Sequence, residues 1–220
     1  SPQMLERYRT MFQGTFYRRF VLGEWVAAEG LVYDFFDESF VHTAPEGLEE
    51  WYISCDYGTV NPTSMGLWGK KDGVWYRTAE FYYDARKMHR QKTDEEYADA
   101  LAELAGGRDI RAVIVDPAAA SFIETLRRRG WRVRRADNRV LSGIRLTARL
   151  LKAGKLVICP GCGDAIREFA LYRWEEQGDG QDRVRKENDH AMDEIRYFAA
   201  TVAERKGGGV YAGCVERGRF

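Results

Sequence analysis

Two apolar runs of strand length each end in an aspartate, and this feature constrains the fold more than any other. The first run ends at Asp56, where Gly58 then turns the chain, and the second ends at Asp116, where Pro117 stops the strand. The continuous apolar stretch before Asp116 is typical of a strand that is buried on both faces of a sheet. A carboxylate at such a position is costly unless something positive neutralises it. Because sites in mixed sheets tend to lie at strand ends, both aspartates are candidate functional residues.

A third concentration of acids begins a helix that the apolar spacing predicts at 188–204. On a helical wheel that advances about 100° per residue, Asp189, His190, Asp193 and Tyr197 share one stripe, and the apolar residues occupy another. A solvated helix start, in which the acids gain from the helix dipole, is the structural alternative. The presence of a histidine among these acids favours a site.

Three carboxylates that converge on one point repel each other, and divalent metal is the natural remedy. We therefore expect Mg²⁺ or Mn²⁺, as two ions roughly 3.5–4 Å apart, that activate a water and stabilise the leaving oxygen in phosphodiester hydrolysis. In this hypothesis Asp56 bridges the ions, Asp116 holds one and Asp193 holds the other. The structural alternatives are a turn cap for Asp56 and a helix cap for Asp116. Assistance to the ions, the water or the phosphate is expected from Asp189, His190 and Lys186.

The expected elements are three strands in hairpin succession, followed by alternating helices and strands. A hairpin signal at Lys71-Asp72-Gly73 joins the second and third strands, and Thr93 with Glu96 forms a capping box that starts a helix. This α/β order predicts an RNase H-like mixed β-sheet flanked by α-helices. The strands are expected at 51–56, 64–69, 74–83, 110–116, 131–135 and 156–159, and the later helices at 118–129, 141–153, 164–174 and 188–204, with a loop or β-hairpin at 175–186.

For Glu80 and for the C-x-x-C pair, a structural role is predicted ahead of a functional one. Glu80 is a possible fourth acid of the site, but its position on an aromatic strand favours an exposed strand residue. Cys159 and Cys162 lack the second pair of ligands that a zinc site needs, so they predict an ordinary turn in a reducing compartment, with a redox role as the weaker alternative.

The net charge is zero, but the segment from Arg127 to Lys155 holds nine Arg and two Lys against one acid, a balance of +10. A basic segment beside an acidic one is typical of a face that binds a polyanion. The density of arginines, without interleaved residues for base readout, predicts contacts to phosphates. Solvated helix faces, or a surface for another domain, are the alternatives. The expected DNA contacts are Arg127, Arg128, Arg129, Arg132, Arg134 and Arg135.

The ends and the hydropathy of the chain limit where it can reside. No run of about 18 apolar residues occurs, so no transmembrane span is expected. The N-terminal segment lacks the apolar core of a signal peptide, and a start at Ser1 without methionine is expected of an excised or processed fragment.

Four stretches carry a family resemblance. They are Phe20-Val-Leu-Gly-Glu-Trp25, Cys55-Asp56-Tyr-Gly, Val115-Asp116 and Lys186-Glu-Asn-Asp-His-Ala-Met-Asp193-Glu-Ile-Arg-Tyr197. Across most of residues 15–205, the chain resembles the C-terminal nuclease domain of the large terminase subunit of tailed bacteriophages. The resemblance implies an RNase H-like endonuclease that cuts concatemeric double-stranded viral DNA with Mg²⁺ or Mn²⁺. It also implies that Asp56, Asp116 and Asp193 bind metal, with His190 three residues before the last acid.

The resemblance further implies a domain plan and partners. Residues 1–50 would be an extension or linker from a missing ATPase domain, 51–206 the nuclease domain and 207–220 a flexible tail. No G-x-x-x-x-G-K-[ST] motif occurs, so the ATPase itself is not expected in this chain. The implied partners are double-stranded DNA, the ATPase domain, the small terminase subunit and the portal, without a membrane, in the host cell cytoplasm.

Other classes remain open from the residues alone. Asp56-Tyr-Gly-Thr59 also resembles the phosphate-binding turn of actin-like sugar kinases and chaperone ATPases, although no second glycine-rich turn follows Asp116. A non-catalytic DNA-binding or assembly module is a further alternative, as is a resolvase or transposase of related fold.

Overall fold

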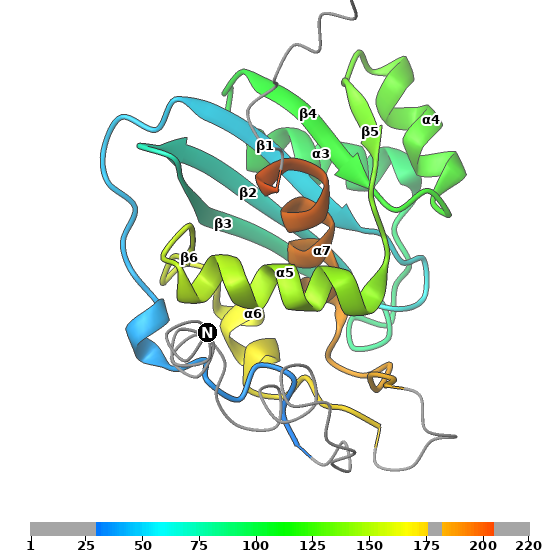
Figure 1. The fold of residues 1–220 in the computed structure, drawn as a ribbon. Coiled ribbons are helices and arrows are strands. Elements are labelled where there is room, and N and C mark those ends of the chain that lie inside the picture. The colour runs from blue at the N-terminus through cyan, green and yellow to red at the C-terminus, as the bar shows by residue number, and fades with distance from the viewer. Residues whose placement is uncertain (1–29, 176–181, 205–220) are drawn as a thin grey trace, which may run out of the picture.

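The structure is a computed structural model that describes residues 30–175 and 182–204. Its centre is a six-stranded mixed sheet with the strand order β5-β4-β1-β2-β3-β6 (Figure 1). The first three strands form an antiparallel meander, β4 is parallel to β1, β5 is parallel to β4, and β6 is parallel to β3. The strands are β1 (Glu50–Asp56), β2 (Thr63–Lys71), β3 (Val74–Tyr83), β4 (Ile110–Val115), β5 (Val133–Arg135) and β6 (Leu156–Ile158).

Helices cover both faces of the sheet (Figure 1). On one face lie α3 (Asp94–Ala105) and α4 (Ala120–Arg128), and on the other lie α5 (Val140–Lys152), α6 (Gly163–Phe169) and α7 (His190–Phe198). The last helix continues as a π-helical turn, η2 (Ala199–Ala203), and a short 3-10 turn, η1 (Glu38–Phe40), precedes β1. This is the α/β, RNase H-like arrangement that the sequence predicts.

The strands separate two apolar cores because their side chains alternate between the faces. In β4, Val113 and Val115 belong to the core under α3 and α4, whereas Ile114 belongs to the core under α5 and α7. All three are fully buried, which confirms that β4 is covered on both faces. On the α7 side, Trp68 of β2 stacks on Phe198 with ring centroids 4.0 Å apart. This contact packs α7 directly onto the central strands.

The capping box at Thr93 is present, and every strand begins and ends within two residues of its predicted range. Three predicted helices have different ends. The helix after Asp116 begins only at Ala120, because the Asp116 carboxylate accepts a hydrogen bond from the Ala118 backbone N–H at 2.7 Å and holds a turn there. Asn188 adopts a left-handed backbone with φ of 52°, so α7 begins at His190 instead.

Helix α6 ends at Phe169, five residues before the predicted end. The chain leaves the helical conformation after Phe169, and Arg173 and Trp174 instead form β-bridges to Leu31 and Val184. The second of these bridges fits the predicted hairpin at 175–186, whose residues 176–181 lie outside the described range.

The segment before β1 packs against the domain where it is described. Val32 and Tyr33 are buried, and the Tyr33 ring contacts Phe169 and Tyr172. The stretch from Phe20 to Trp25 and the predicted tail at 207–220 lie outside the described residues.

The C-x-x-C forms a buried turn, in which the Cys162 backbone N–H donates to the Cys159 carbonyl at 3.0 Å and both thiols are free. None of the helices in residues 30–175 and 182–204 has the length and apolar character that a bilayer crossing needs.

Candidate active site

The candidate site forms where β1 and β4 end and α7 begins. Asp56 is the last residue of β1, and Asp116 directly follows β4. The two strands are parallel neighbours with Cys55 opposite Val115, so the aspartates that follow these residues reach the same edge of the sheet. Helix α7 packs across β1 and β2 and brings its first turn to this edge. Acids that are more than 130 positions apart in the chain therefore meet here.

Asp56 lies at the centre of a set of direct contacts. The His190 ring places Nδ1 2.9 Å from Asp56 Oδ2. The Tyr197 hydroxyl donates to Asp116 Oδ2 at 2.7 Å and lies 3.5 Å from Asp56 Oδ1. Tyr197 thus joins the two strand-end carboxylates. The sequence places Tyr197 on the acidic stripe of the helix, but this bridging contact needs the packed structure.

The α7 acids line the other side of a cleft of about 300 Å³. The Lys186 ammonium lies 3.5 Å from Asp189 Oδ2 and 3.6 Å from Asp193 Oδ2, and its side chain is 68% exposed. Asp193 also accepts a hydrogen bond from the buried Arg196 guanidinium at 2.8 Å. The residues that line the cleft are Asp56, Tyr57, Gly58, Asn61, Lys186, Asp189, His190 and Asp193. Asp116 is not among them and connects to the cleft through Tyr197.

The charges in the cleft shift one another's pKa values. Burial raises the pKa of Asp56 to about 6; the hydrogen bond with His190 opposes this shift, and the charge of Asp193 adds to it. Burial and the charge of Asp193 also raise the pKa of Asp189. Burial lowers the pKa of His190, but the hydrogen bond and the charge of Asp56 outweigh it and raise that pKa. Asp56 therefore carries a net cost for being ionised, which a further cation would relieve.

The donor atoms around the cleft suit a hard divalent cation in type. Asp56, Asp189 and Asp193 supply carboxylate oxygens, the ligands that Mg²⁺ and Mn²⁺ prefer. In the described residues, no three acidic, histidine or cysteine side chains are arranged to hold one ion as they stand. Lys186, His190 and Arg196 pair with oxygens of these carboxylates in this structure. Burial raises the pKa of Asp56, so a divalent cation beside it would favour its ionised form.

A buried network holds α7 against the sheet. Glu194, which is 0% exposed, accepts hydrogen bonds from Ser54 and from Trp68 at 3.1 Å, and forms an ion pair with Arg77 at 2.9 Å. Burial would lower the pKa of Arg77, but the charge of Glu194 outweighs it, so the guanidinium stays charged. A Cβ at Gly66 would lie 2.5 Å from the Glu194 carboxylate, so only glycine leaves room for it.

Glu80 belongs to this network, and the expectation that it is an exposed strand residue is wrong. Its side chain is 7% exposed, because it forms an ion pair with Arg77 at 2.6 Å and accepts the backbone N–H of Asp164 at 2.6 Å. A second buried acid, Glu168, accepts the Ala191 N–H at 2.7 Å and the Tyr82 hydroxyl at 2.6 Å. It thereby supports the first turn of α7. No local pattern in the sequence distinguishes these acids from surface acids.

The predicted DNA-contacting arginines fall into two groups. Arg129 forms ion pairs with Glu95 and Asp99 of α3, both at 2.6 Å, and Arg134 donates to the Thr201 carbonyl at 2.8 Å. These two side chains hold elements of the domain together. The side chains of the other four are on the surface, namely Arg127, Arg128, Arg132 and Arg135.

Comparisons with known proteins add family information to this geometry. No protein-family model matches the chain, and no curated protein does. Among solved structures, the large terminase of the thermophilic bacteriophage D6E in complex with ADP is 44% identical, with a TM-score of 0.87 over 93% of this chain and 53% of that one. This chain thus spans about half the length of that relative.

Two terminase nuclease structures are similar in fold. The P22 large terminase nuclease domain is 18% identical, with a TM-score of 0.64 over 80% of this chain and 93% of that one. The large terminase nuclease from thermophilic phage G20c with bound magnesium is 13% identical, with a TM-score of 0.58 over 79% of this chain and 98% of that one. The chain is therefore a structural relative of the large terminases, and it has the RNase H-like fold of their nuclease domains.

Proposed function

We propose that this chain is a metal-dependent endonuclease that cleaves concatemeric double-stranded viral DNA during genome packaging. The observation that carries the proposal is the meeting of Asp56, Asp189 and Asp193 around one cleft, with Asp116 connected to it through the Tyr197 hydroxyl. The similarity to the D6E large terminase supports the biological setting. Structures of the G20c nuclease hold magnesium or cobalt, which supports a divalent cation as the cofactor.

Asp56, Asp189 and Asp193 of the cleft, together with Asp116 beside it, would hold two Mg²⁺ or Mn²⁺ ions. Such ions activate a water and stabilise the leaving oxygen of a phosphodiester. The chain's own residues orient these ligands. His190 holds one oxygen of Asp56, and Tyr197 holds Asp116 by donating its hydroxyl proton. Lys186, whose ammonium reaches the cleft from an exposed position, would contact the phosphate.

We further propose that Arg127, Arg128, Arg132 and Arg135 contact DNA phosphates, whereas Arg129 and Arg134 act through the domain contacts described above. The domain plan remains a proposal, with residues 1–50 as a linker from an ATPase domain, 51–206 as the nuclease and 207–220 as a tail. The ATPase domain, the small terminase subunit and the portal are the proposed partners, and the host cytoplasm is the proposed location.

Cleavage of duplex DNA tests the proposed activity. Linear and supercoiled DNA should be cut in Mg²⁺ or Mn²⁺, and cleavage should stop in excess chelator. Asp56→Asn should lose cleavage because it removes a ligand charge without changing the side-chain volume. Asp72→Asn is the matched control, since Asp72 lies exposed in the β2–β3 turn at a φ of 49° that asparagine also adopts. Cleavage that persists in chelator, or in Asp56→Asn, would refute the proposal.

A further inference from the structure

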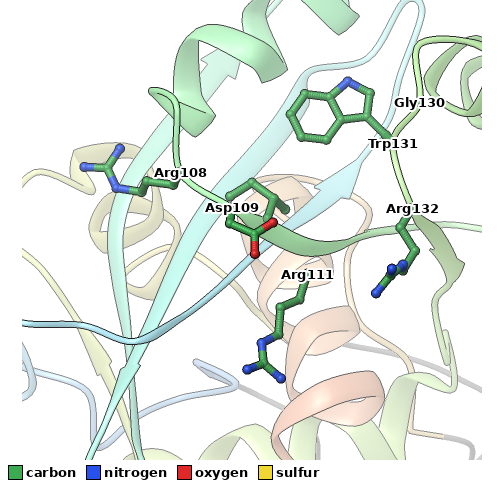
Figure 2. A pocket seen from close by; sticks show the side chains of 7 residues that line it. Arg108, Asp109, Arg111, Gly130, Trp131 and Arg132 are labelled. Carbon is green, nitrogen blue, oxygen red and sulfur yellow. The ribbon is translucent and has the colours of Figure 1, made fainter.

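A second charged cavity lies away from the acidic cleft. Its volume is about 580 Å³, and it lies at the start of β4, where Arg108, Asp109 and Arg111 meet Trp131 and Arg132 from the α4–β5 connection (Figure 2). The four charged side chains are on the surface. Three guanidinium groups against one carboxylate leave an excess of two positive charges.

The strand ladder fixes the position of this cavity relative to the acids. The cavity is at Ile110, the first residue of β4, and Asp116 follows the last residue of the same strand. A strand rises about 3.3 Å per residue, so the two ends are separated by about 20 Å. That length corresponds to about six base pairs of duplex, at about 3.4 Å per pair.

The cationic side chains are partly held in place before any ligand binds. The Arg108 guanidinium lies 4.7 Å from the centroid of the Trp51 ring and donates to the Ala105 carbonyl at 3.1 Å. Arg111 lies 3.6 Å from Glu50, an exposed and loose pairing that a stronger anion can replace. In Figure 2, Arg111 and Arg132 extend to the same side of β4 as the Asp109 carboxylate. Both arginines line the cavity, so both side chains can contribute to binding an anionic ligand there.

The chemistry of the lining favours phosphate as that ligand. All the cations are arginines, whose planar forks match phosphate oxygens in pairs, and Trp131 presents a partly exposed ring beside them. The cavity also adjoins β5, the edge strand of the sheet, whose last residue Arg135 pairs with Val115 next to Asp116. Exposed arginines thus occur at both ends of this edge, whereas the candidate catalytic acids lie only at the end near Asp116.

We propose that the cavity at the start of β4 binds the phosphate backbone of duplex DNA and anchors it along the β5 edge, about six base pairs from the acidic cleft. This inference rests on the proposed function, because it takes the ligand to be the duplex that the cleft would cut. The cavity would add affinity and fix the direction of the DNA without reading its sequence, as contacts to phosphates do.

The test measures binding of a 30-base-pair fluorescent duplex by anisotropy in chelator, so that cleavage plays no part. Arg111→Gln combined with Arg132→Gln removes two charges and leaves Arg108 packed on Trp51. We expect roughly tenfold weaker binding and a salt dependence whose log–log slope falls by about 2, since each phosphate contact contributes about 0.9. The matched control combines Arg149→Gln with Lys155→Gln, two exposed charges on and after α5, and should bind as the unchanged protein does.

Asp109→Asn provides a change in the opposite direction. It removes the one carboxylate of the cavity, so DNA should bind more tightly. Equal DNA affinity and equal salt slope in the unchanged protein and in the Arg111/Arg132 variant would overturn the proposal and leave an acidic protein segment as the occupant. An equal loss in the control variant would also overturn it, because binding would then follow net charge. Neither result depends on whether the cleft cuts DNA. A negative result would therefore refute the role of the cavity without refuting the proposed nuclease function.

Discussion

Asp193 and Glu194 are neighbours on α7, yet they lie in opposite environments. Asp193 faces the cleft, where it shares Lys186 with Asp189 and contributes to raising the pKa of Asp56. Glu194 points into the sheet, where Ser54, Trp68 and Arg77 satisfy its oxygens. Asp193 also pairs with Arg196 and lies among the other carboxylates of the cleft, whereas Glu194 is fully buried and shares Arg77 with Glu80. The same turn of α7 therefore places one carboxylate in the cleft, at Asp193, and uses the next one, Glu194, to attach the helix to the sheet.

The largest expected effect is on stability, at the buried acid. Glu194→Gln should lower the free energy of unfolding by about 3–5 kcal/mol, because it leaves the fully buried Arg77 without its main counter-charge. Urea or thermal unfolding measures this loss. The control is Glu50→Gln, which breaks a partly exposed pair with Lys70 and should cost less than about 1 kcal/mol. Equal losses in the two variants would remove the distinction between the two environments.

The next effect is on activity, at the acid that faces the cleft. Asp193→Asn should reduce cleavage by about 100-fold or more, the scale seen when the surroundings of a metal are disturbed. It should also lower the free energy of unfolding, since the buried Arg196 loses its counter-charge and keeps a neutral acceptor, so cleavage is measured where the variant is folded. Unchanged cleavage by the folded variant would show that Asp193 is chiefly structural.

Divalent metal should stabilise the cleft and not the buried network. At about ten times its dissociation constant, Mg²⁺ or Mn²⁺ should add about 1.4 kcal/mol to the free energy of unfolding, through binding to the folded state alone. Thermal unfolding with and without the ion measures the shift. The shift should be lost in Asp193→Asn and kept in Glu50→Gln. A shift that survives in Asp193→Asn would place the ions elsewhere.

The smallest expected effect concerns the Tyr197 hydroxyl, which lies between the two strand-end acids. Tyr197→Phe removes the hydroxyl that donates to Asp116, which should cost about 1 kcal/mol of stability. It should also weaken Mn²⁺ binding measured by calorimetry, because Asp116 is then held only by the hydrogen bond from the Ala118 backbone N–H. Tyr52→Phe, whose ring packs against Trp75 in the α7 core, serves as the control. Unchanged metal affinity in Tyr197→Phe would show that the hydroxyl does not position Asp116.

Much of the fold follows from local patterns in the sequence. The continuous apolar run before Asp116 predicts a strand covered on both faces, and β4 is one. Thr93 and Glu96 predict the start of α3, because a capping box depends on residues only three apart. Helix ends are less predictable. Asn188 and Asp116 delay the helices that follow them through a left-handed backbone and a side-chain turn, which apolar periodicity does not reveal.

The site divides in the same way. Asp56, Asp116, Asp189 and Asp193 stand out in the sequence as candidates, because acids at the ends of apolar strands or on one helical stripe with a histidine are costly without a positive partner. The roles of Glu80, Glu168 and Glu194 are not identifiable, because each depends on partners from other elements.

The sequence by itself determined the strands, most of the helices and which carboxylates are candidates for the cleft, because these depend on spacing and side-chain chemistry within short segments. Only the tertiary structure decided which acids are buried in the packed interior, which face the cleft, and which cation each of them pairs with. It decided this by bringing Arg77 to Glu194, Lys186 between Asp189 and Asp193, and Tyr197 across to Asp116. The physical reason is that the cost of a buried charge depends on its distance from opposite charges, and the packing of α7 on the sheet sets those distances.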